Sequence, residues 1–253
     1  MERTSLELRI WRGDVTGGDM VPYRVPVREG MVVLDAVLWV QANMAPDLAV
    51  RWNCKAAKCG SCSAEIQGFP RLMCKTPIAD YGEQITVRPM KAFPVIKDLV
   101  TDVSWNYEIN KLIPPFTPSE ADLSSSEPWR MQQQDVERVQ EFRKCIECFL
   151  CQDVCHVLRD HELKQAYFGP RYMIRIASLE MHPKDVLDRR PLLKGHAGVG
   201  YCNVTKCCQE VCPEHIHITD NAIIPLKERM DDVYFDPLRS VIRRLGGGNR
   251  KRG

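Results

Sequence analysis

Long apolar runs and leader-like segments are missing from this sequence. The most apolar stretch, Met31 to Val40, is interrupted by Asp35 and is shorter than the ~18 residues that suggest a membrane span. Residues 1–12 contain no basic segment followed by an apolar one, so we expect no signal peptide. No glycine-rich dinucleotide fingerprint occurs either. We therefore expect a soluble intracellular protein that neither crosses a membrane nor binds a dinucleotide itself.

A strong charge of either sign is also absent. The formal net charge is +2, which favours no particular class of partner. A length of 253 residues with 44% hydrophobic content is enough for two modest domains. Cysteine, by contrast, is abundant, with 12 residues. In a chain without a signal sequence, this number indicates metal binding rather than disulfides.

Eleven of these cysteines fall into three spaced patterns. Thiolate sulfur is the ligand of iron–sulfur clusters, and a compact cluster needs its sulfur ligands presented from tight loops. The patterns are Cys54-x4-Cys59-x2-Cys62-x11-Cys74, Cys145-x2-Cys148-x2-Cys151-x3-Cys155 and Cys202-x5-Cys208-x3-Cys212-Pro213. Three clusters on one chain predict a conduit for single electrons.

The first pattern predicts a 2Fe-2S cluster. Cys54, Cys59 and Cys62 lie close together in the sequence, while Cys74 returns from a neighbouring strand. Gly60 lets backbone N–H groups approach the cluster sulfurs, which raises the reduction potential. The alternative is a structural zinc site, but zinc sites usually present two separate pairs of ligands.

The second and third patterns are interpreted together, because the fourth cysteine of such a run ligates the other cluster in two-cluster ferredoxins. The middle position of the third pattern is Thr205 instead of cysteine, which leaves one cluster a ligand short. We therefore expect a 4Fe-4S cluster with four thiolates and a 3Fe-4S cluster with three. The expected 4Fe-4S ligands are Cys145, Cys148, Cys151 and Cys212, and the expected 3Fe-4S ligands are Cys155, Cys202 and Cys208.

Two points about these ligands stay open. The alternative is a pair of four-iron clusters, one of them with a non-cysteine ligand. Cys207 is adjacent to Cys208 and is available for recruitment, although a small buried residue near the cluster is the simpler interpretation. The crossed ligands join residues 145–155 to residues 202–212, so we expect the clusters to hold this half of the chain together.

The first hundred residues predict a small mixed fold. Apolar residues alternate in two runs on either side of Gly17-Gly18-Asp19, which predicts a β-hairpin with its turn at these residues. A helical period follows and ends before Pro46. Hairpin, helix and returning strands are the elements of a β-grasp fold, the architecture of plant-type ferredoxins. The hairpin strands are expected around residues 6–10 and 21–27, the helix around 34–41, and the returning strands around 63–66 and 84–87.

The second half of the chain predicts helices. Residues 104–130 are rich in proline and serine, which favours a linker. Beyond it, a helical period leads into the second cysteine pattern, and Pro170 after Gly169 is typical of the first position of a helix. We expect an α+β protein with four segments: a β-grasp domain at 1–108, a linker at 109–130, an all-α domain with 4Fe-4S and 3Fe-4S clusters at 131–244, and a flexible basic tail at 245–253.

The order of these cluster patterns resembles the iron–sulfur subunit of succinate dehydrogenase or fumarate reductase. The resemblance spans roughly residues 5–230, and its motifs are specific in combination. It is carried by Arg51-Trp52-Asn53-Cys54, Cys59-Gly60-Ser61-Cys62, Leu72-Met73-Cys74-Lys75-Thr76-Pro77, Pro94-Val95-Ile96-Lys97-Asp98-Leu99-Val100, Gly169-Pro170-Arg171 and Cys212-Pro213.

The resemblance implies the remaining parts of the system. A separate flavoprotein subunit carries FAD and oxidises succinate to fumarate, and electrons pass through the 2Fe-2S, 4Fe-4S and 3Fe-4S clusters to a quinone at a membrane-anchor subunit. The chain itself then has no catalytic residues, binds no nucleic acid, and lies on the cytoplasmic face of a bacterial inner membrane or on the matrix face in mitochondria. The alternative is that the chain belongs to a fumarate reductase, which works in the opposite direction, or that it transfers electrons for another flavin dehydrogenase. A redox-inactive zinc-binding interaction module is a further alternative.

Two positions depart from the family pattern near the expected 3Fe-4S cluster. Cys155 is followed by His156, where the family has proline and many members then have a tryptophan pair. Asn203 follows Cys202, where many members have histidine. The usual quinone contacts are therefore not carried over to this chain, and His156 and His161 are alternative candidates.

Overall fold

The alternating apolar residues near the start of the chain form a hairpin. In the computed structural model, which describes residues 4–234, β1 (Ser5–Asp14) and β2 (Gly17–Pro26) pair antiparallel. Leu6, Leu8 and Ile10 point into the core and are almost fully buried, as their period of two predicts. The expected hairpin is therefore confirmed.

The turn of this hairpin lies earlier than the sequence predicts. Val15 and Thr16 form the connection, and Gly17 and Gly18 already belong to β2. The Asp14 carboxylate accepts hydrogen bonds from the Thr16 backbone N–H at 2.8 Å and from its hydroxyl at 2.6 Å, which stabilises the turn. Gly18 is needed in the strand for space, because a Cβ there would lie 2.3 Å from the Arg12 carbonyl oxygen.

The other strands build a mixed sheet around β1. Its order is β4-β3-β5-β1-β6-β7, with β2 paired to β1, and β5 runs parallel to β1. The expected strands at 63–66 and 84–87 are confirmed as β3 and β5. The strands are β3 (Ser63–Ile66), β4 (Phe69–Leu72), β5 (Gln84–Arg88), β6 (Val95–Lys97) and β7 (Val100–Thr101).

One helix completes the core of the sheet. α1 (Val33–Asn43) buries Leu34 and Val37, and it ends before Pro46 as expected. The Asp35 carboxylate accepts the Val32 backbone N–H at the start of this helix. Hairpin, helix and returning strands together form the predicted β-grasp architecture. The short helices η1 (Met73–Lys75) and η2 (Ile78–Asp80) follow β4.

The second half of the described chain is helical, as expected. Pro170 occupies the first turn of α7 and Gly169 precedes it with φ +84°, which confirms the predicted helix start. The helices are α2 (Ser104–Lys111), α3 (Glu120–Ser124), α4 (Gln133–Gln140), η3 (Glu141–Lys144), α5 (Leu150–Asp153), α6 (His156–Arg159), α7 (Pro170–Glu180), α8 (Arg190–Lys194), η4 (Val199–Tyr201), α9 (Cys207–Glu210), the π-helix η5 (Ile218–Ile223) and α10 (Ile224–Tyr234).

The proline- and serine-rich segment is more ordered than its composition predicts, because it contains α2 and α3. Asn106 of α2 is fully buried and binds two helices of the second half. Its side-chain oxygen accepts from Gln152 Nε2 at 3.3 Å, and its carbonyl accepts from the Tyr172 hydroxyl. These long-range bonds fix α2 along the helical half, and local composition does not reveal them.

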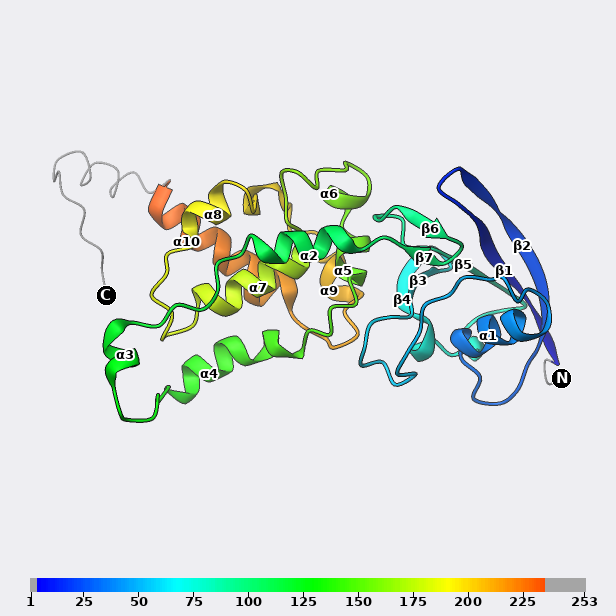
Figure 1. Ribbon diagram of the computed structural model, residues 1–253, viewed down its shortest axis with the longest axis horizontal. Coiled ribbons are helices and arrows are strands. Elements are labelled where there is room, and N and C mark those ends of the chain that lie inside the picture. The colour runs from blue at the N-terminus through cyan, green and yellow to red at the C-terminus, as the bar shows by residue number, and fades with distance from the viewer. Residues whose placement is uncertain (1–3, 235–253) are drawn as a thin grey trace.

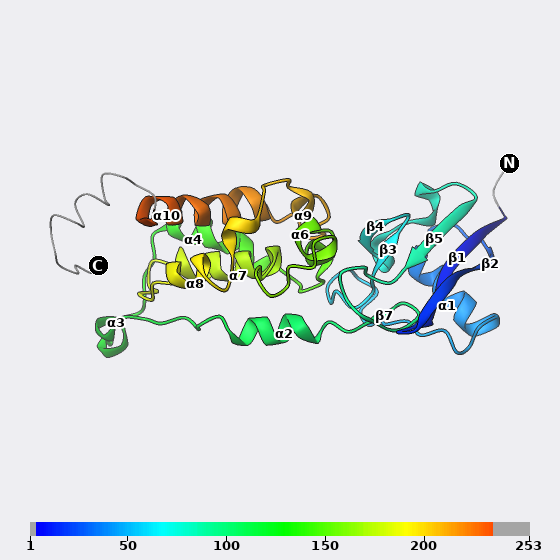
Figure 2. The same cartoon turned by 90° about the horizontal axis from the view of Figure 1, so that it is seen from above.

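The sheet and the helices lie end to end in an elongated molecule (Figure 1). Figure 2 shows the same arrangement from above, with α6 and α9 at the end of the helical half that faces the sheet, where Figure 1 also shows α5. No helix within residues 4–234 is both long and apolar enough to cross a bilayer. The expected basic tail at 245–253 lies outside the described residues.

Candidate metal centres

The first cysteine set occupies an irregular loop between α1 and β3. Cys54 is exposed, Cys59 is half-buried and Cys62 is buried. Cys74 lies in η1, and the Met73 backbone N–H donates to the Cys62 carbonyl at 3.0 Å, which brings this segment beside the loop. The structure therefore brings the four predicted ligands of the first pattern into one neighbourhood.

Backbone N–H groups in this loop point at sulfur. The N–H groups of Ala56 and Lys58 both donate to Cys54 Sγ at 3.3 Å. Burial acts to raise the pKa of Cys59, but hydrogen bonds from Ser61 and from Cys54 outweigh it and lower the pKa to about 6. Burial raises the pKa of Cys62 to about 12. The loop thus stabilises negative charge on its outer sulfurs.

The second set lines a small cavity at the end of the helical half. Cys145, Cys148 and Cys151 come from the segment around α5, and Cys212 comes from the segment after α9. Burial raises the pKa of Cys148 to about 12 and that of Cys151 well above its usual range. The structure therefore unites the four predicted thiols across a long stretch of sequence.

A buried cation stands beside this cavity. The Arg171 side chain is 7% exposed, lines the cavity and pairs with the Glu147 carboxylate. Burial acts to lower the pKa of Arg171, but the neighbouring Cys145 and Glu147 outweigh it and raise the pKa. Arg171 therefore stays charged and compensates negative charge on the thiols.

The third set lines a second small cavity. It combines Cys155 at the start of α6, Cys202 after η4 and Cys208 in α9. Burial raises the pKa of Cys155 to about 11 and that of Cys208 to about 12. The three predicted thiols therefore share one buried site, as their spacing indicates.

The residues left open by the sequence also line this third cavity. Thr205 and Cys207 both face it, and the Thr205 hydroxyl lies 3.3 Å from Cys207 Sγ. Cys207 is half-buried rather than a core residue. His156 and Asn203 line the cavity too, and the rings of His156 and His161 lie 6.3 Å apart in an edge-on arrangement.

Sequence reasoning missed two buried hydroxyl groups at this cavity. Tyr167 and Thr219 both line it, and each side chain is 1% exposed. Burial, together with the charges of Cys202 and Cys155, raises the pKa of Tyr167 well above its usual range. Neither residue belongs to a cysteine motif, so the spacing of the cysteines carried no signal for them.

The cysteine loop of the sheet half touches the helical half directly. Gly60 has φ +69°, and a Cβ there would lie 2.6 Å from Cys148 Cα. The Ser63 hydroxyl donates to the carbonyls of both Gly60 and Cys148 at 2.8 Å. Lys75 Nζ donates to the Pro213 carbonyl at 2.9 Å. The first and second thiol sets are therefore held against each other by specific backbone contacts.

A buried group of charges reinforces this junction. Arg159 of α6 pairs with Glu65 of β3 at 2.5 Å, and Asp153 of α5 accepts the Ala92 backbone N–H at 2.9 Å. Burial raises the pKa of Asp153 to about 7 and also raises the pKa of Glu65, against the lowering effect of Arg159. Both carboxylates are at most 5% exposed, so they depend on these partners.

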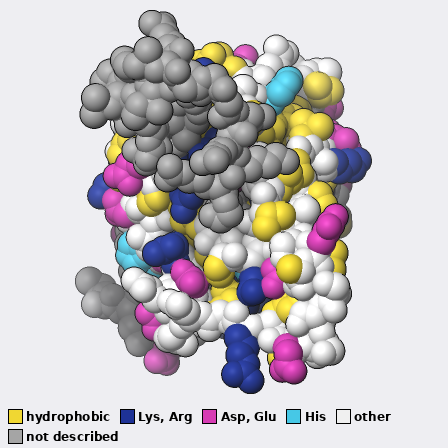
Figure 3. All heavy atoms as spheres, turned by 90° about the vertical axis from the view of Figure 1, so that its left-hand side faces the viewer, with side chains coloured by type: hydrophobic (Ala, Val, Ile, Leu, Met, Phe, Trp, Pro, Cys, Tyr) yellow, Lys and Arg dark blue, Asp and Glu magenta, His cyan; other side chains and the backbone are white. Residues whose placement is uncertain are grey.

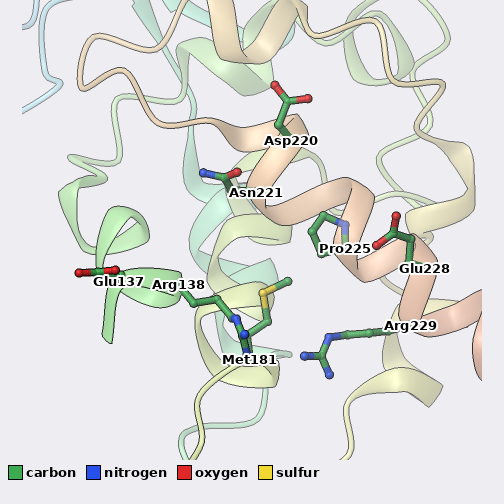
Figure 4. A pocket seen from close by; sticks show the side chains of 8 residues that line it. All are labelled: Glu137, Arg138, Met181, Asp220, Asn221, Pro225, Glu228 and Arg229. Carbon is green, nitrogen blue, oxygen red and sulfur yellow. The ribbon is translucent and has the colours of Figure 1, made fainter. Parts of the chain in front are cut away.

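A separate hollow of about 600 Å³ in the helical half contains no cysteine. Figure 4 shows Arg138 and Arg229 pointing toward one another across it, with Met181 nearby. Charges of both signs line it, including Glu137 and Glu228. Figure 3 shows that charged and apolar side chains are interspersed on the visible part of the helical end. This hollow offers no donor set comparable to the thiol cavities.

The chemistry of the thiol sites fits iron–sulfur clusters. Within residues 4–234, no group of three or more His, Cys, Asp or Glu side chains is arranged to hold a single metal ion. The thiols instead surround spaces, with apolar walls such as Ile174 and Ile218 at the second site. Soft sulfur donors in a dry shell are what iron–sulfur clusters require.

Comparison with known proteins agrees with this donor chemistry. Residues 7–108 match the 2Fe-2S iron–sulfur cluster binding domain, and residues 141–216 match the 4Fe-4S dicluster domain. The chain is 30% identical over 207 residues to the fumarate reductase iron–sulfur subunit of Haemophilus influenzae, a match that covers 77% of this chain and 80% of that protein. It is 28% identical over 225 residues to the fumarate reductase iron–sulfur subunit of Mycobacterium tuberculosis, covering 85% of this chain and 88% of that one.

A solved structure is more similar still. A chain in the structure described as the Mycobacterium smegmatis Sdh1 complex in the apo form is 60% identical to this chain. The two superpose with a TM-score of 0.90, and the match covers 94% of this chain and 100% of the other. Sequence and fold therefore point to the same group of proteins.

Proposed function

Because the chain belongs to the family of iron–sulfur subunits of succinate dehydrogenase and fumarate reductase, we propose that it works in the direction of succinate oxidation. The chain is an electron-transfer subunit of an oxidoreductase, with a 2Fe-2S and a 4Fe-4S binding domain. Its remaining cysteines are consistent with a 3Fe-4S cluster. The likeness to the Sdh1 chain supports the oxidative direction.

One observation carries the proposal of three clusters. Cys212 lines one cavity with Cys145, Cys148 and Cys151, whereas Cys155 lines the next cavity with Cys202 and Cys208. This crossing is the arrangement in which two clusters share two cysteine runs. Thr205 faces the second of these cavities, which supports a missing ligand there.

The proposed ligands follow from this arrangement. When bound, each cluster supplies a centre that accepts and releases a single electron. The proposed ligands are Cys54, Cys59, Cys62 and Cys74 for 2Fe-2S, Cys145, Cys148, Cys151 and Cys212 for 4Fe-4S, and Cys155, Cys202 and Cys208 for 3Fe-4S.

The protein's own contribution is to hold the clusters, to shield them from water and to stabilise their negative charge. Backbone N–H groups donate to Cys54 sulfur, and Arg171 places a positive charge beside Cys145. Ile174 and Ile218 exclude water from the second cavity. The hydrogen bond from the Ser63 hydroxyl to the Cys148 carbonyl holds the first and second sites at a fixed separation. The rate of electron transfer between two clusters depends on that separation.

In the proposed domain scheme, each half of the chain holds its own clusters. Residues 1–108 form the 2Fe-2S domain, residues 109–130 connect the domains, and residues 131–244 form the helical domain. Two apolar cores support this division. One is built on Leu8, Val37 and Ile85 and the other on Met173 and Ile223, while Leu150 of α5 packs into the first core at the junction. Residues 245–253 are the proposed basic tail.

The proposed partners are a FAD-containing flavoprotein, one or more membrane-anchor subunits and a quinone. The relatives are named as subunits, which supports assembly with further chains. The exposed thiol of Cys54 and the half-exposed ring of Trp52 give the flavoprotein an accessible surface beside the first site. The proposed location is peripheral, on the cytoplasmic face of a bacterial inner membrane or the mitochondrial matrix face.

Fumarate reduction is the second candidate, since the curated relatives above carry that name. Low-temperature EPR of the isolated complex tests the direction proposed here. An oxidised 3Fe-4S signal that disappears on addition of succinate, while a reduced 2Fe-2S signal appears, is the expected result. A 3Fe-4S signal that succinate leaves unchanged would contradict succinate as the electron donor.

The ligand assignment has its own test. Cys208→Ser should abolish the 3Fe-4S signal and spare the 2Fe-2S signal, because Cys208 lines only the third cavity. An unaltered spectrum would contradict the assignment. Thr205→Cys should convert the third site to a 4Fe-4S cluster of lower potential, and persistence of the 3Fe-4S spectrum would exclude Thr205 as the position of the missing ligand.

A further inference from the structure

Two buried hydroxyl groups share the third cavity with the thiols of Cys155, Cys202 and Cys208. Tyr167 lies in the loop before α7, and Thr219 lies in the π-helix η5. Both side chains are 1% exposed and both line the cavity. They approach it from segments that are far apart in sequence, so neither placement follows from the cysteine runs.

The π-helix aims the Thr219 hydroxyl at a thiol. Thr219 Oγ1 lies 3.5 Å from Cys208 Sγ. The Gln209 side chain supports this wide turn, since its oxygen accepts the Thr219 N–H at 3.2 Å and its nitrogen donates to Asp220 at 3.0 Å. π-helical turns are rare and frequently occur at functional sites. Here the turn fixes a hydroxyl beside sulfur.

The Tyr167 hydroxyl has no hydrogen-bond partner among the described residues. Leaving a buried hydroxyl without a partner is unfavourable, so a native structure normally provides it with one. Tyr167 lines the same cavity as the thiols of Cys155, Cys202 and Cys208. Its missing partner therefore belongs in the thiol cavity.

The backbone that carries Tyr167 is held from two sides. The Phe168 N–H donates to the Ala197 carbonyl at 3.2 Å, and the Phe168 carbonyl accepts from Gln152 Nε2 at 3.0 Å. Gly198, with φ +59°, packs so closely that a Cβ there would lie 1.8 Å from the Ala166 carbonyl oxygen. The backbone on either side of Tyr167 is thus held between residues 197–198 and α5.

We propose that the hydroxyls of Tyr167 and Thr219 donate hydrogen bonds to sulfur atoms of the group held by Cys155, Cys202 and Cys208, and thereby raise its reduction potential. A donor at sulfur stabilises the negative charge that an added electron brings. Tyrosine is protonated at neutral pH, so toward sulfide or thiolate it acts as a donor. The inference rests on the proposed 3Fe-4S assignment of these three thiols.

The neighbouring cavity is built differently. There a buried cation, Arg171, stands beside the thiols. The third cavity instead has the buried hydroxyls of Tyr167 and Thr219, and the lysine that also lines it, Lys206, is half exposed and pairs with Asp220. Charge and hydrogen bonding are separate means of setting cluster potentials. The two adjacent sites can therefore hold different potentials although both are lined by buried thiols.

The test is a redox titration of the assembled membrane complex, followed by EPR of the oxidised 3Fe-4S signal. Tyr167→Phe and Thr219→Val each remove one hydroxyl and keep the shape of the side chain. Each variant should lower the midpoint potential of the 3Fe-4S cluster, and the double variant should lower it further. The 2Fe-2S midpoint, measured in the same samples, should stay unchanged.

Matched controls separate hydrogen bonding from general disturbance. Tyr172→Phe removes a buried hydroxyl that donates to the Asn106 carbonyl, and Thr86→Val removes a partly exposed hydroxyl that pairs with Gln67 in the sheet half. Neither control should move the 3Fe-4S midpoint. Equal shifts in controls and variants, or no shift in Tyr167→Phe and Thr219→Val, would overturn the inference.

Thr219→Ser supplies a conservative variant that keeps the hydroxyl. The midpoint potential of Thr219→Ser should stay close to that of the unaltered complex. If Tyr167→Phe fails to assemble, the comparison of Thr219→Ser with Thr219→Val still tests the inference. Pulsed EPR in deuterated water should also detect an exchangeable proton near the cluster that Tyr167→Phe removes. Absence of any 3Fe-4S signal from the unaltered complex would overturn the ligand assignment itself. A normal 3Fe-4S signal whose midpoint potential does not move in the variants would overturn only the inference about the two hydroxyls.

Discussion

Three of the four thiols of the sheet half are exposed or half-buried, whereas four of the seven thiols grouped at the two cavities of the helical half are buried. In the sheet half, Cys54 is exposed and accepts two backbone N–H groups, and hydrogen bonds lower the pKa of Cys59 to about 6. In the helical half, Cys151 and Cys208 are part of the apolar core. Burial raises the pKa of Cys208 to about 12. The first set of thiols lies in a loop beside the core of the sheet half, whereas the other two sets line cavities inside the helical half.

This difference separates the sources of stability of the two halves. The sheet half has an apolar core built on Leu8, Val37 and Ile85, and three of its thiols lie at or near the surface. The helical half has cavities in the middle of its core, and the helices around them are as short as four residues in α5, α6 and α9. Such short helices are not stable by themselves. The clusters should therefore stabilise the helical half far more than the sheet.

The largest expected effect follows from preparing the chain without clusters. Metal binding to a site that forms only on folding contributes about 10 kcal/mol or more in small metal domains. The amides of α7 and η5 should lose most of their protection from hydrogen exchange, while those of β1 and β5 keep theirs. Mass spectrometry of exchanged peptides measures both regions in one sample. Full protection of α7 in the cluster-free chain would contradict the comparison.

A smaller effect is expected from breaking the buried ion pair between the halves. Arg159→Met leaves Glu65 buried without its charged partner, which should lower the free energy of unfolding by about 3 kcal/mol. Chemical unfolding of the cluster-loaded protein, followed by the visible absorption of the clusters, measures the loss.

Lys91→Met is the matched control for this pair. Lys91 pairs with Asp160 at 3.0 Å on the surface close by, and both side chains are about half exposed. Its loss should cost about 0.5 kcal/mol, since solvent screens exposed pairs. Equal losses in the two variants would show that the junction is not held by a buried charge.

A change at Gly60 sharpens the comparison at the point where the two halves touch. Gly60→Ala should cost about 1 kcal/mol for the positive φ and about 2 kcal/mol more for the clash with the Cys148 backbone. Gly68→Ala provides the control, because Gly68 has φ +79° with nothing within 4 Å of its Cβ position. Thermal unfolding of both variants measures the difference, and identical losses would contradict a close contact at Gly60.

The mildest test changes no residue and uses pH. In cluster-free protein, Cys59 should be alkylated by iodoacetamide at a rate that levels off above about pH 7, because its pKa is lowered to about 6. Cys62, in the same loop, should react slowly at neutral pH and faster with each step toward pH 11, because burial raises its pKa to about 12 and the sheet half keeps its fold without clusters. Peptide mass spectrometry follows each thiol, and denatured protein serves as the control. Parallel pH profiles in the native protein would contradict the two environments.

Much of the fold was predictable because its signals are local. The period of two in β1 and β2, the helical period of α1 and the Gly169–Pro170 helix start all depend on neighbouring residues. The hairpin turn was placed too late, because glycines in β2 serve close packing rather than the turn. The helix α2 was missed, because Asn106 is fixed by bonds to Gln152 and Tyr172 that sequence does not reveal.

The candidate sites show the same distinction between features that are local in the sequence and features that depend on tertiary packing. Thiol spacing was enough to group the cysteines, since cluster ligands follow fixed intervals in sequence. Tyr167, Thr219 and Arg171 reach the cavities only through tertiary packing, and their residue types are common elsewhere in the chain. No spacing rule could select them. Donor atoms are therefore visible in the sequence, while the groups that tune them require the structure.

The iron content of each site tests the central claim most directly. Mössbauer spectroscopy of the complex enriched in iron-57 resolves two-iron, three-iron and four-iron clusters by their spectra. The ligand sets proposed here predict cluster iron in the proportion two to four to three, with the smallest share from the site of Cys54, Cys59, Cys62 and Cys74. A proportion of two to four to four in the intact complex would contradict the account, because it would require a fourth ligand at the cavity that Thr205 and Cys207 line.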